Sequence, residues 1–258
     1  MPVALVTGAS RGVGKGVAIA LHDAGYRVFA TGRTIGSSDL PSGITRLQCD
    51  HTIDDDTSAA FARIAEATPS LDVVVNNSWR GYERMMEAGQ FTWGLPFWQQ
   101  PAHRWSSMMD AGVRAAWAVS SRAVPMMLPQ RRGLIVNVGH WAAQKYIGNT
   151  IYGVSKAATD KLTADMAHEL RTHGVSVISL YPGLVRTEAV LEAAKYGVFD
   201  LATSESPEFV GRVIAALADD PRLTARSGTV VVAAQAAIEL GVKDVDGKQP
   251  PVLTLDTV

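Results

Sequence analysis

Near its amino terminus the chain reads Val3-Ala4-Leu5-Val6-Thr7-Gly8-Ala9-Ser10-Arg11-Gly12-Val13-Gly14, a short apolar run followed directly by a glycine-rich turn. Four consecutive apolar residues are typical of a strand that is buried on both faces of a parallel sheet. The glycines allow a tight turn into a helix whose N-terminus is suited to hold a phosphate. An ordinary strand-to-helix turn can have the same composition. The interpretation as a phosphate-binding loop therefore depends on the position of the glycines directly after the first strand.

Apolar runs and helical patterns then alternate along the chain. Further strands are predicted at Arg27–Thr31, Thr45–Cys49, Leu71–Val75, Leu134–Val138, Val175–Leu180 and Thr229–Val232. Helices are predicted at Gly14–Ala24, Thr57–Ala67, Ala102–Met127, Tyr152–Thr172 and Pro207–Ala218. This order predicts an α/β fold with a doubly wound parallel sheet of about seven strands and helices on both faces.

Composition limits the function classes. The 258 residues are 47% hydrophobic and contain no linker, so we expect a single domain over residues 1–258. The net charge of −1 argues against a protein that coats nucleic acid or an anionic membrane. The one cysteine, Cys49, and the lack of a Cys/His cluster predict no disulfide and no metal site, and favour a cytoplasmic location. Neither a signal peptide nor a membrane span is expected.

The end of the second predicted strand indicates which dinucleotide binds. A site for NAD usually has an acidic residue there, but the sequence is Ala30-Thr31-Gly32-Arg33-Thr34. Arg33 could instead pair with the 2′-phosphate of NADP, helped by Arg11 in the glycine loop. The alternative for Arg33 is a solvated loop cation. The pattern favours NADP(H), with NAD(H) as the second choice.

Tyr152 and Lys156 are four residues apart, on one face of a predicted helix. A phenol with an ordinary pKa near 10 is a poor acid or base at neutral pH, and an adjacent cation lowers that value. The pair is therefore suited to general acid–base chemistry on an alcohol or a carbonyl. A half-buried tyrosine with a lysine reaching past it to solvent is the structural alternative.

In their order and spacing, these motifs resemble the short-chain dehydrogenase/reductase family over nearly the whole chain. The motifs are the Thr7–Gly14 loop, Asp50 after the third strand, Asn76-Asn77-Ser78 after the fourth, Tyr152 with Lys156, and the Tyr181–Thr187 segment after the sixth. The resemblance implies hydride transfer between NADP(H) and a carbonyl/alcohol pair. It also implies that Tyr152 exchanges a proton with the substrate oxygen, while Lys156 bonds the nicotinamide ribose and lowers the pKa of Tyr152.

The resemblance further implies a set of cofactor contacts. The pyrophosphate and adenosine ribose are assigned to Gly8, Ser10, Arg11, Gly12, Val13 and Gly14. Asp50 is expected to reach the adenine amino group, with the backbone of His51 beside it and Asn76 under the adenosine ribose. The nicotinamide carboxamide is assigned to Pro182, Gly183, Val185 and Thr187.

Two departures from the family pattern affect the catalytic prediction. Gly139 and His140 stand where the family usually has serines, and Gly112 stands where it usually has an asparagine. His140 could donate a hydrogen bond to the substrate oxygen or titrate near neutral pH, or it could merely fill a polar niche. The competing hypothesis is a catalytically impaired NADP(H)-binding protein that acts as a sensor or an assembly partner.

Aromatic residues indicate where a substrate binds. All six tryptophans lie between Trp79 and Trp141, and an aromatic-rich insert is predicted at about residues 79–104. Such an insert either lines an apolar substrate pocket or packs at a subunit interface. A second lid is predicted at about 188–206, with Tyr196 and Phe199 as candidate pocket residues. We expect an apolar or aromatic carbonyl or secondary alcohol as substrate, and a homodimer or homotetramer.

Overall fold

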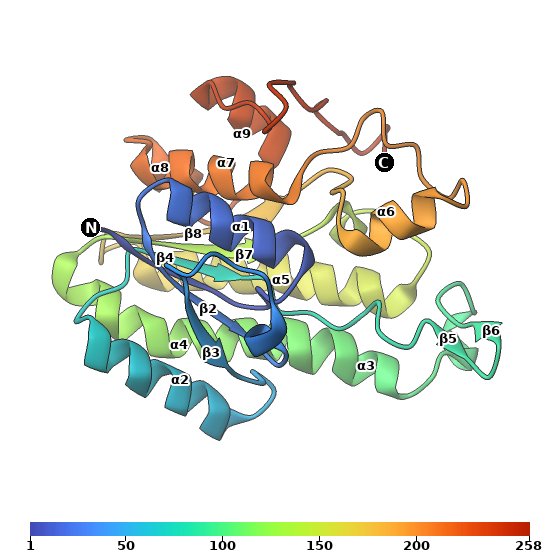
Figure 1. Cartoon of the computed structure of the whole chain (residues 1–258), viewed down its shortest axis with the longest axis horizontal. Helices are drawn as coiled ribbons and strands as arrows, with labels where there is room; N and C mark the ends of the chain where they lie inside the picture. The colour runs from blue at the N-terminus through green and yellow to red at the C-terminus, as the bar shows by residue number, and fades with distance from the viewer.

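The computed structural model describes residues 1–258 and contains one parallel sheet (Figure 1). Its strands are β1 (Val3–Val6), β2 (Arg27–Gly32), β3 (Thr45–Gln48), β4 (Val73–Asn76), β7 (Gly133–Val138), β8 (Val175–Tyr181) and β9 (Val230–Val232). They are ordered β3-β2-β1-β4-β7-β8-β9, which confirms the doubly wound fold. All predicted strands are present; the largest difference is at Leu71, because β4 begins only at Val73.

Helices cover both faces of the sheet. One face carries α1 (Gly12–Asp23), α7 (Pro207–Asp219), α8 (Leu223–Arg226) and α9 (Ala233–Leu240), and the other carries α2 (Asp54–Ala67), α4 (Ala115–Met127) and α5 (Thr150–Leu170) (Figure 1). Alternate strand residues supply the two cores: Ala4 and Val6 pack toward the first face, Val3 and Leu5 toward the second. None of these helices is both long and apolar enough to cross a membrane.

The predicted helix over Ala102–Met127 is helical from His103 onward, but it contains a π-helical stretch that the sequence did not predict. The segment consists of α3 (His103–Met108), a π-helical stretch η3 (Met109–Arg114) and α4. Gly112, a weak helix former, lies within the π-helical stretch. The π-helical stretch joins α3, at the end of the insert, to α4, which packs on the sheet.

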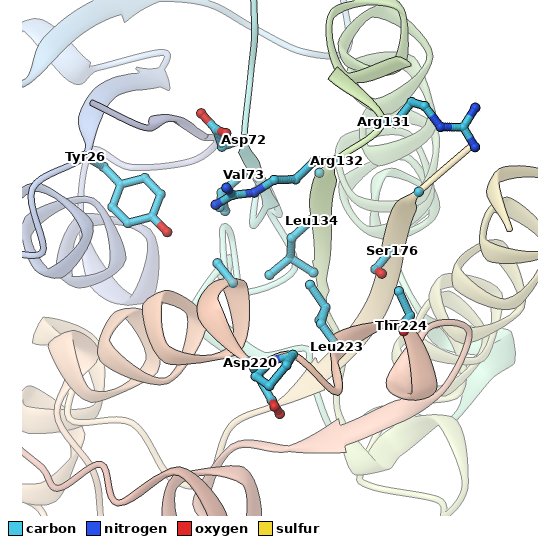
Figure 2. A pocket seen from close by; sticks show the side chains of 14 residues that line it. Tyr26, Asp72, Val73, Arg131, Arg132, Leu134, Ser176, Asp220, Leu223 and Thr224 are labelled. Atoms are coloured by element: carbon cyan, nitrogen blue, oxygen red, sulfur yellow. The ribbon is translucent and has the colours of Figure 1, made fainter. Parts of the chain in front are cut away.

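The carboxyl ends of the strands meet at one edge of the sheet, where the insert and α6 (Glu188–Ala194) also lie (Figure 1). The insert contains a two-stranded hairpin, β5 (Met86–Glu87) with β6 (Gln90–Phe91), which the sequence did not predict. A cavity of about 300 Å³ lies at the opposite edge, against Val73, Leu134 and Ser176 near the starts of β4, β7 and β8 (Figure 2). That cavity is therefore separate from the carboxyl edge, where ligands bind in open parallel sheets.

Helix α1 packs against α7 through backbone contacts. A Cβ added at Gly16 would lie 2.6 Å from the backbone nitrogen of Glu208, and one added at Gly211 would lie 2.7 Å from Cβ of Ala20. Only glycine allows the two helices to approach this closely. The contact fixes the direction of α1, and therefore the place to which its N-terminus points.

We predict that Gly16→Ala lowers the free energy of unfolding by about 1–2 kcal/mol. Overpacking costs about 1–3 kcal/mol, and the better helix propensity of alanine returns roughly 1 kcal/mol or less. Urea denaturation followed by circular dichroism measures the change. Gly36→Ala is the control, because a Cβ at Gly36 meets nothing within 4 Å. Equal stability of Gly16→Ala and the wild type would contradict the proposed backbone contact.

Candidate active site

The glycine loop is tied to the end of β4 by Thr7 and Asn77. The Thr7 hydroxyl accepts hydrogen bonds from the backbone N–H groups of Asn77 (3.0 Å) and Ser78 (3.1 Å). In return the Asn77 side-chain amide donates to the carbonyl of Gly8 at 3.1 Å. The sequence predicts no role for Asn77 beyond its place in the Asn76-Asn77-Ser78 motif. The structure makes it the residue that positions the loop.

The loop fits a phosphate-bearing group. Gly8 and Gly12 have positive φ angles of 65° and 58°, and a Cβ at Gly14 would lie 2.9 Å from the carbonyl carbon of Gly8. The backbone N–H of Gly12, at the N-terminus of α1, donates to a carboxylate oxygen of Glu188 at 2.9 Å. An anionic oxygen is thus bound at the helix end where the pyrophosphate was predicted.

Most of the other predicted loop residues surround this helix end. Ser10 packs against Gly32 at the end of β2, where its hydroxyl leaves no room for a Cβ. Val13 is half-buried and packs on the core beneath α1. Gly8, Ser10, Gly12 and Gly14 therefore shape the backbone of the turn, whereas the side chain of Val13 faces the core.

Arg11 and Arg33 come together, as the prediction of a 2′-phosphate site requires. Both guanidinium groups form ion pairs with the same oxygen of Glu83, which belongs to the insert. The Arg11 pair measures 3.4 Å, and both arginine side chains are partly exposed. Each arginine therefore has an anionic partner, although both side chains are exposed to solvent.

Asp50 has a partly exposed carboxylate at the carboxyl edge of the sheet, whereas the His51 side chain is buried. Burial raises the pKa of Asp50, but hydrogen bonds from Thr52 and the Arg80 guanidinium outweigh it, so the pKa is lowered overall. The ring of His51 is buried and bonds the Thr31 hydroxyl at 2.7 Å. Burial lowers the pKa of His51 to about 4. Its neutral ring is part of the core, which leaves its backbone for the predicted contact.

Asn76 faces the interior. Its side-chain amide donates to Oδ1 of Asn137 at 2.8 Å and to the Ser120 hydroxyl at 3.0 Å. Asn137 in turn donates to the Thr163 hydroxyl at 2.8 Å. This buried chain of polar groups links β4, β7, α4 and α5. In this arrangement the Asn76 amide holds the strands together rather than pointing to the cofactor edge.

Tyr152 and Lys156 lie on α5 beside the end of β7. The Lys156 ammonium donates to the carbonyl of Val138 at 2.8 Å and lies 5.5 Å from the ring of Trp79. Tyr152 is only 4% exposed, and its ring centroid lies 5.3 Å from that of His140. The three predicted catalytic residues are therefore brought together at the carboxyl edge.

The pKa of Tyr152 is not lowered as expected. Burial raises it well above its usual value, and the neighbouring phenols of Tyr82 and Tyr181 raise it further. Lys156 is bonded to Val138 instead, and burial lowers its pKa to about 8, partly offset by Asp160. In this closed arrangement the low-dielectric surroundings oppose charge on both groups.

The places of the two missing polar residues are filled from elsewhere in the chain. A Cβ at Gly139 would lie 2.6 Å from a ring carbon of Tyr181, and one at Gly112 would lie 3.0 Å from a ring carbon of Trp79. Tyr181 is held in place by a hydrogen bond from its hydroxyl to Asp160. A serine side chain at position 139 would overlap this aromatic ring, so glycine is required there.

His140 is neutral in this structure. Its Nδ1 accepts a hydrogen bond from the backbone N–H of Ala142 at 3.1 Å, which places the ring proton on Nε2. Burial and the nearby charge of Lys156 lower the pKa of His140 to about 4. The prediction that it titrates near neutral pH is therefore wrong. A neutral ring with an Nε2–H can still donate a hydrogen bond.

The insert covers Tyr152 with aromatic rings. The ring centroids of Trp79 and Trp93 each lie 5.4 Å from that of Tyr152. The side-chain amide of Asn149, the N-cap residue of α5, donates to the carbonyl of Trp93 at 3.0 Å. Other aromatic residues point outward, among them Trp98, which is 70% exposed. The inner rings face the catalytic residues and the outer rings face solvent.

Arg104, which the sequence did not single out, organises the insert. It is fully buried, and its guanidinium donates to the carbonyl of Gly81 at 2.9 Å and to the Thr92 hydroxyl at 2.6 Å. It also lies 5.8 Å from the ring of Trp93. A buried cation with these partners fixes both ends of the hairpin relative to α3.

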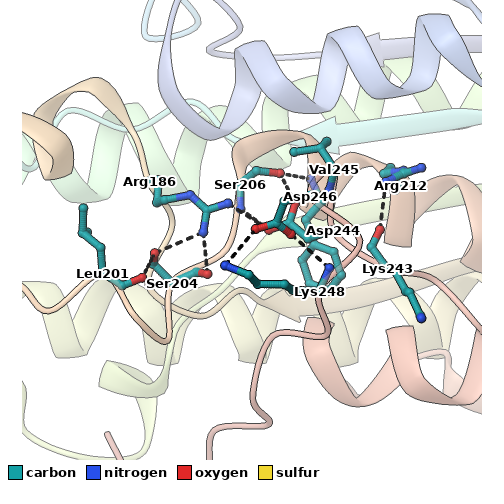
Figure 3. A network of polar contacts seen from close by, with 11 residues as sticks. Arg186, Leu201, Ser204, Ser206, Arg212, Lys243, Asp244, Val245, Asp246 and Lys248 are labelled. Atoms are coloured by element: carbon teal, nitrogen blue, oxygen red, sulfur yellow. Dashed lines mark hydrogen bonds and ion pairs between the residues drawn. The ribbon is translucent and has the colours of Figure 1, made fainter.

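The second lid is fixed at its base by Asp244. This buried carboxylate accepts hydrogen bonds from Arg186 at 3.1 Å and from the backbone N–H of Ser206 at 2.8 Å, at the two ends of the lid (Figure 3). The segment after β8 that contains Pro182, Gly183, Val185 and Thr187 is bridged to the end of the lid, because Val185 pairs with Glu205. Tyr196 is 78% exposed, so the expectation that it lines a pocket is wrong here.

Glu205 is a second buried acid beside this segment. A Cβ at Gly183 would lie 2.9 Å from its carboxylate, so the glycine allows close approach. Burial raises the pKa of Glu205 to about 7, with Asp244 adding to the effect and the Gly183 backbone opposing it. The Glu205 carboxyl group therefore packs directly against Gly183 of the predicted carboxamide site. Because its pKa is about 7, its charge changes near neutral pH.

Fold and site together define a dinucleotide-binding α/β protein with a Tyr–Lys pair at the carboxyl edge. The family model described as short chain dehydrogenase matches residues 2–196. The chain belongs to the short-chain dehydrogenase/reductase family, and the family supports a dehydrogenase or reductase activity that uses NAD(P).

Several relatives agree with this assignment. Dehydrogenase/reductase SDR family member 1 of Mus musculus and that of Homo sapiens are each 36% identical over 95% of this chain and 84% of their own. Serine 3-dehydrogenase of Rhizobium radiobacter is 28% identical over 72% of this chain and 73% of its own. A solved short chain dehydrogenase/reductase family protein superimposes with a TM-score of 0.73 at 28% identity, covering 90% of this chain and 94% of that one.

We predict that Arg104→Gln opens the insert. The substitution leaves the buried Thr92 hydroxyl and the Gly81 carbonyl without the charged donor, a loss of about 1–3 kcal/mol. Trypsin should then cleave after Arg80 or Arg84 at least about tenfold faster under native conditions, as measured by mass spectrometry of the fragments. Arg122→Gln, on the far side of α4, is the control. An unchanged cleavage rate would show that Arg104 does not hold the insert.

Proposed function

We propose that the protein is an NADP(H)-dependent oxidoreductase that interconverts a carbonyl and an alcohol on an apolar or aromatic small molecule. The observation that carries the proposal is the meeting of Tyr152, Lys156 and His140 beside a glycine loop that already binds an anionic oxygen. Family membership supports the reaction class. The cofactor preference and the substrate class are our own inferences from the residues around the site.

The roles of the residues follow from their chemistry. A bound nicotinamide would supply or accept the hydride. In the reducing direction Tyr152 gives its phenolic proton to the substrate oxygen, and it takes the proton back in oxidation. The Lys156 ammonium stabilises the phenolate that this transfer leaves. The Nε2–H of His140 donates a hydrogen bond to the same substrate oxygen, in place of the usual serine hydroxyl.

Two arginines support NADP(H) over NAD(H). Arg11 and Arg33 converge on a single carboxylate oxygen, and the end of β2 offers no acidic side chain to bond a ribose hydroxyl. Guanidinium groups match the geometry of phosphate oxygens. The pair is therefore suited to the 2′-phosphate that distinguishes NADP from NAD.

The insert supports an apolar substrate. The rings of Trp79 and Trp93 pack on the ring of Tyr152, and the Lys156 ammonium lies 5.5 Å from the Trp79 ring. Aromatic walls with a few polar groups are typical of small-molecule sites. The substrate must displace part of this aromatic cover, because Tyr152 is buried in the present conformation.

Assembly and location complete the proposal. Trp105 and Trp117 are half exposed on α3 and α4, where they form one apolar surface with Leu162 of α5. Such a surface suits a homodimer or a homotetramer built on these helices. The one cysteine, Cys49, is free and buried, which suits a reducing compartment such as the cytoplasm.

We predict that Tyr152→Phe lowers kcat by at least about a hundredfold, because it removes the proton that is transferred. NADPH binding should change by less than about twofold, since the phenol does not touch the glycine loop. NADPH oxidation with a panel of aromatic and aliphatic ketones measures turnover, and fluorescence titration measures binding. NADPH binding without turnover in the wild type, unaffected by Tyr152→Phe, would support the impaired sensor or assembly protein instead.

We predict that His140→Asn lowers kcat/KM by about a hundredfold, the usual cost of one hydrogen-bond donor to a reacting oxygen. Since the pKa of His140 lies near 4, its ring stays neutral as pH rises above about 5 and gains charge only as pH falls below that value. The pH profiles of wild type and variant should therefore run parallel above about pH 5. An inflection between about pH 6 and 7 that only the wild type shows would contradict this assignment.

A further inference from the structure

Two acidic side chains occupy the positions where the cofactor phosphates are predicted. Glu83, from the insert, pairs with both Arg11 and Arg33. Glu188, the first residue of α6, accepts the hydrogen bond from the backbone N–H of Gly12 at the N-terminus of α1. One carboxylate comes from the insert and the other from the second lid. Glu83 pairs with the two arginines, and Glu188 with the backbone N–H of Gly12.

The geometry around Glu83 suits an exchange for phosphate. One oxygen, Oε1, receives both guanidinium groups, as a phosphate oxygen would. Neither Arg11 nor Arg33 bonds another side chain, and the Arg11 side chain is 74% exposed, so both cations can follow an incoming anion.

The fold of the insert holds Glu83 in this place. Its backbone carbonyl accepts a hydrogen bond from the buried Arg104 at 3.5 Å, and its backbone N–H donates to the carbonyl of Arg80 at 3.0 Å. Its side chain is about one third exposed, so the ion pairs are weak enough to be replaced. These backbone hydrogen bonds position the Glu83 carboxylate next to the two arginines.

Building on the proposed function, we propose that Glu83 and Glu188 are internal substitutes for the cofactor phosphates, and that Glu83 sets the discrimination between NADP(H) and NAD(H). NADP(H) must replace Glu83 at the arginines with its 2′-phosphate. NAD(H) has no such group, so Glu83 stays paired with Arg33 when NAD(H) binds. Both cofactors carry the pyrophosphate, so both must replace Glu188 at Gly12.

The two residues therefore make different predictions. Glu83→Gln removes the competing charge at the arginines and should lower the Kd of NADPH about fivefold, which corresponds to roughly 1 kcal/mol. The Kd of NADH should change by less than about twofold. Glu188→Gln should lower the Kd of both cofactors by a similar factor, about two- to fivefold. Isothermal titration calorimetry measures all four constants without turnover.

Matched controls are available on the same two segments. Glu87→Gln changes an insert carboxylate that pairs with Arg84 instead, and Glu192→Gln changes one on α6 that pairs with Lys195. Neither should alter the Kd of either cofactor. Thermal melting of each variant verifies that the fold is kept.

The outcomes separate this inference from the proposed function. An unchanged NADPH affinity in Glu83→Gln, or an equal change for NADPH and NADH, would overturn the role of Glu83 in discrimination. An unchanged affinity for both cofactors in Glu188→Gln would overturn its role as a pyrophosphate substitute. A wild type that binds neither cofactor, or binds NADH more tightly than NADPH, would contradict the proposed cofactor instead.

Discussion

The hydrogen bonds between Thr7 and Asn77 join the ends of β1 and β4, and the whole carboxyl edge depends on this junction. The glycine loop leaves the sheet at Thr7, and the insert leaves it directly after Ser78. Because β1 and β4 pair in parallel, their carboxyl ends lie side by side, and the glycine loop and the insert start from neighbouring positions. Because these positions are fixed, the loop and the insert can face each other across the site without a long flexible connection.

Burial dominates the electrostatics of the catalytic residues. The aromatic cover raises the pKa of Tyr152 and lowers those of Lys156 and His140, so all three are pushed toward their neutral forms. Charge separation between phenolate and ammonium becomes favourable only when polar groups enter this space. The surroundings of Tyr152 and Lys156 therefore oppose the charge separation that the proposed proton transfer needs, and under that proposal polar groups of the cofactor and substrate would offset this effect.

The sequence predicted the sheet well because strands buried on both faces leave uninterrupted apolar runs, such as Val73–Val75 and Ile135–Val136. It also placed Tyr152, Lys156 and the glycine loop at one edge, since parallel strands end together. It located the insert at about residues 79–104 but did not predict its hairpin or the buried cation, Arg104, that holds it. Nor could it show that Tyr181 and Trp79 fill the space beside Gly139 and Gly112, because these neighbours are distant in sequence and meet only in the fold.

The segment from Trp79 to Glu83 contacts both ends of the predicted cofactor cleft. Trp79 packs on Tyr152 and lies over Lys156, while Glu83 pairs with Arg11 and Arg33. Under the proposed exchange, a group that replaces Glu83 at the arginines would displace part of the same short segment that packs on Tyr152.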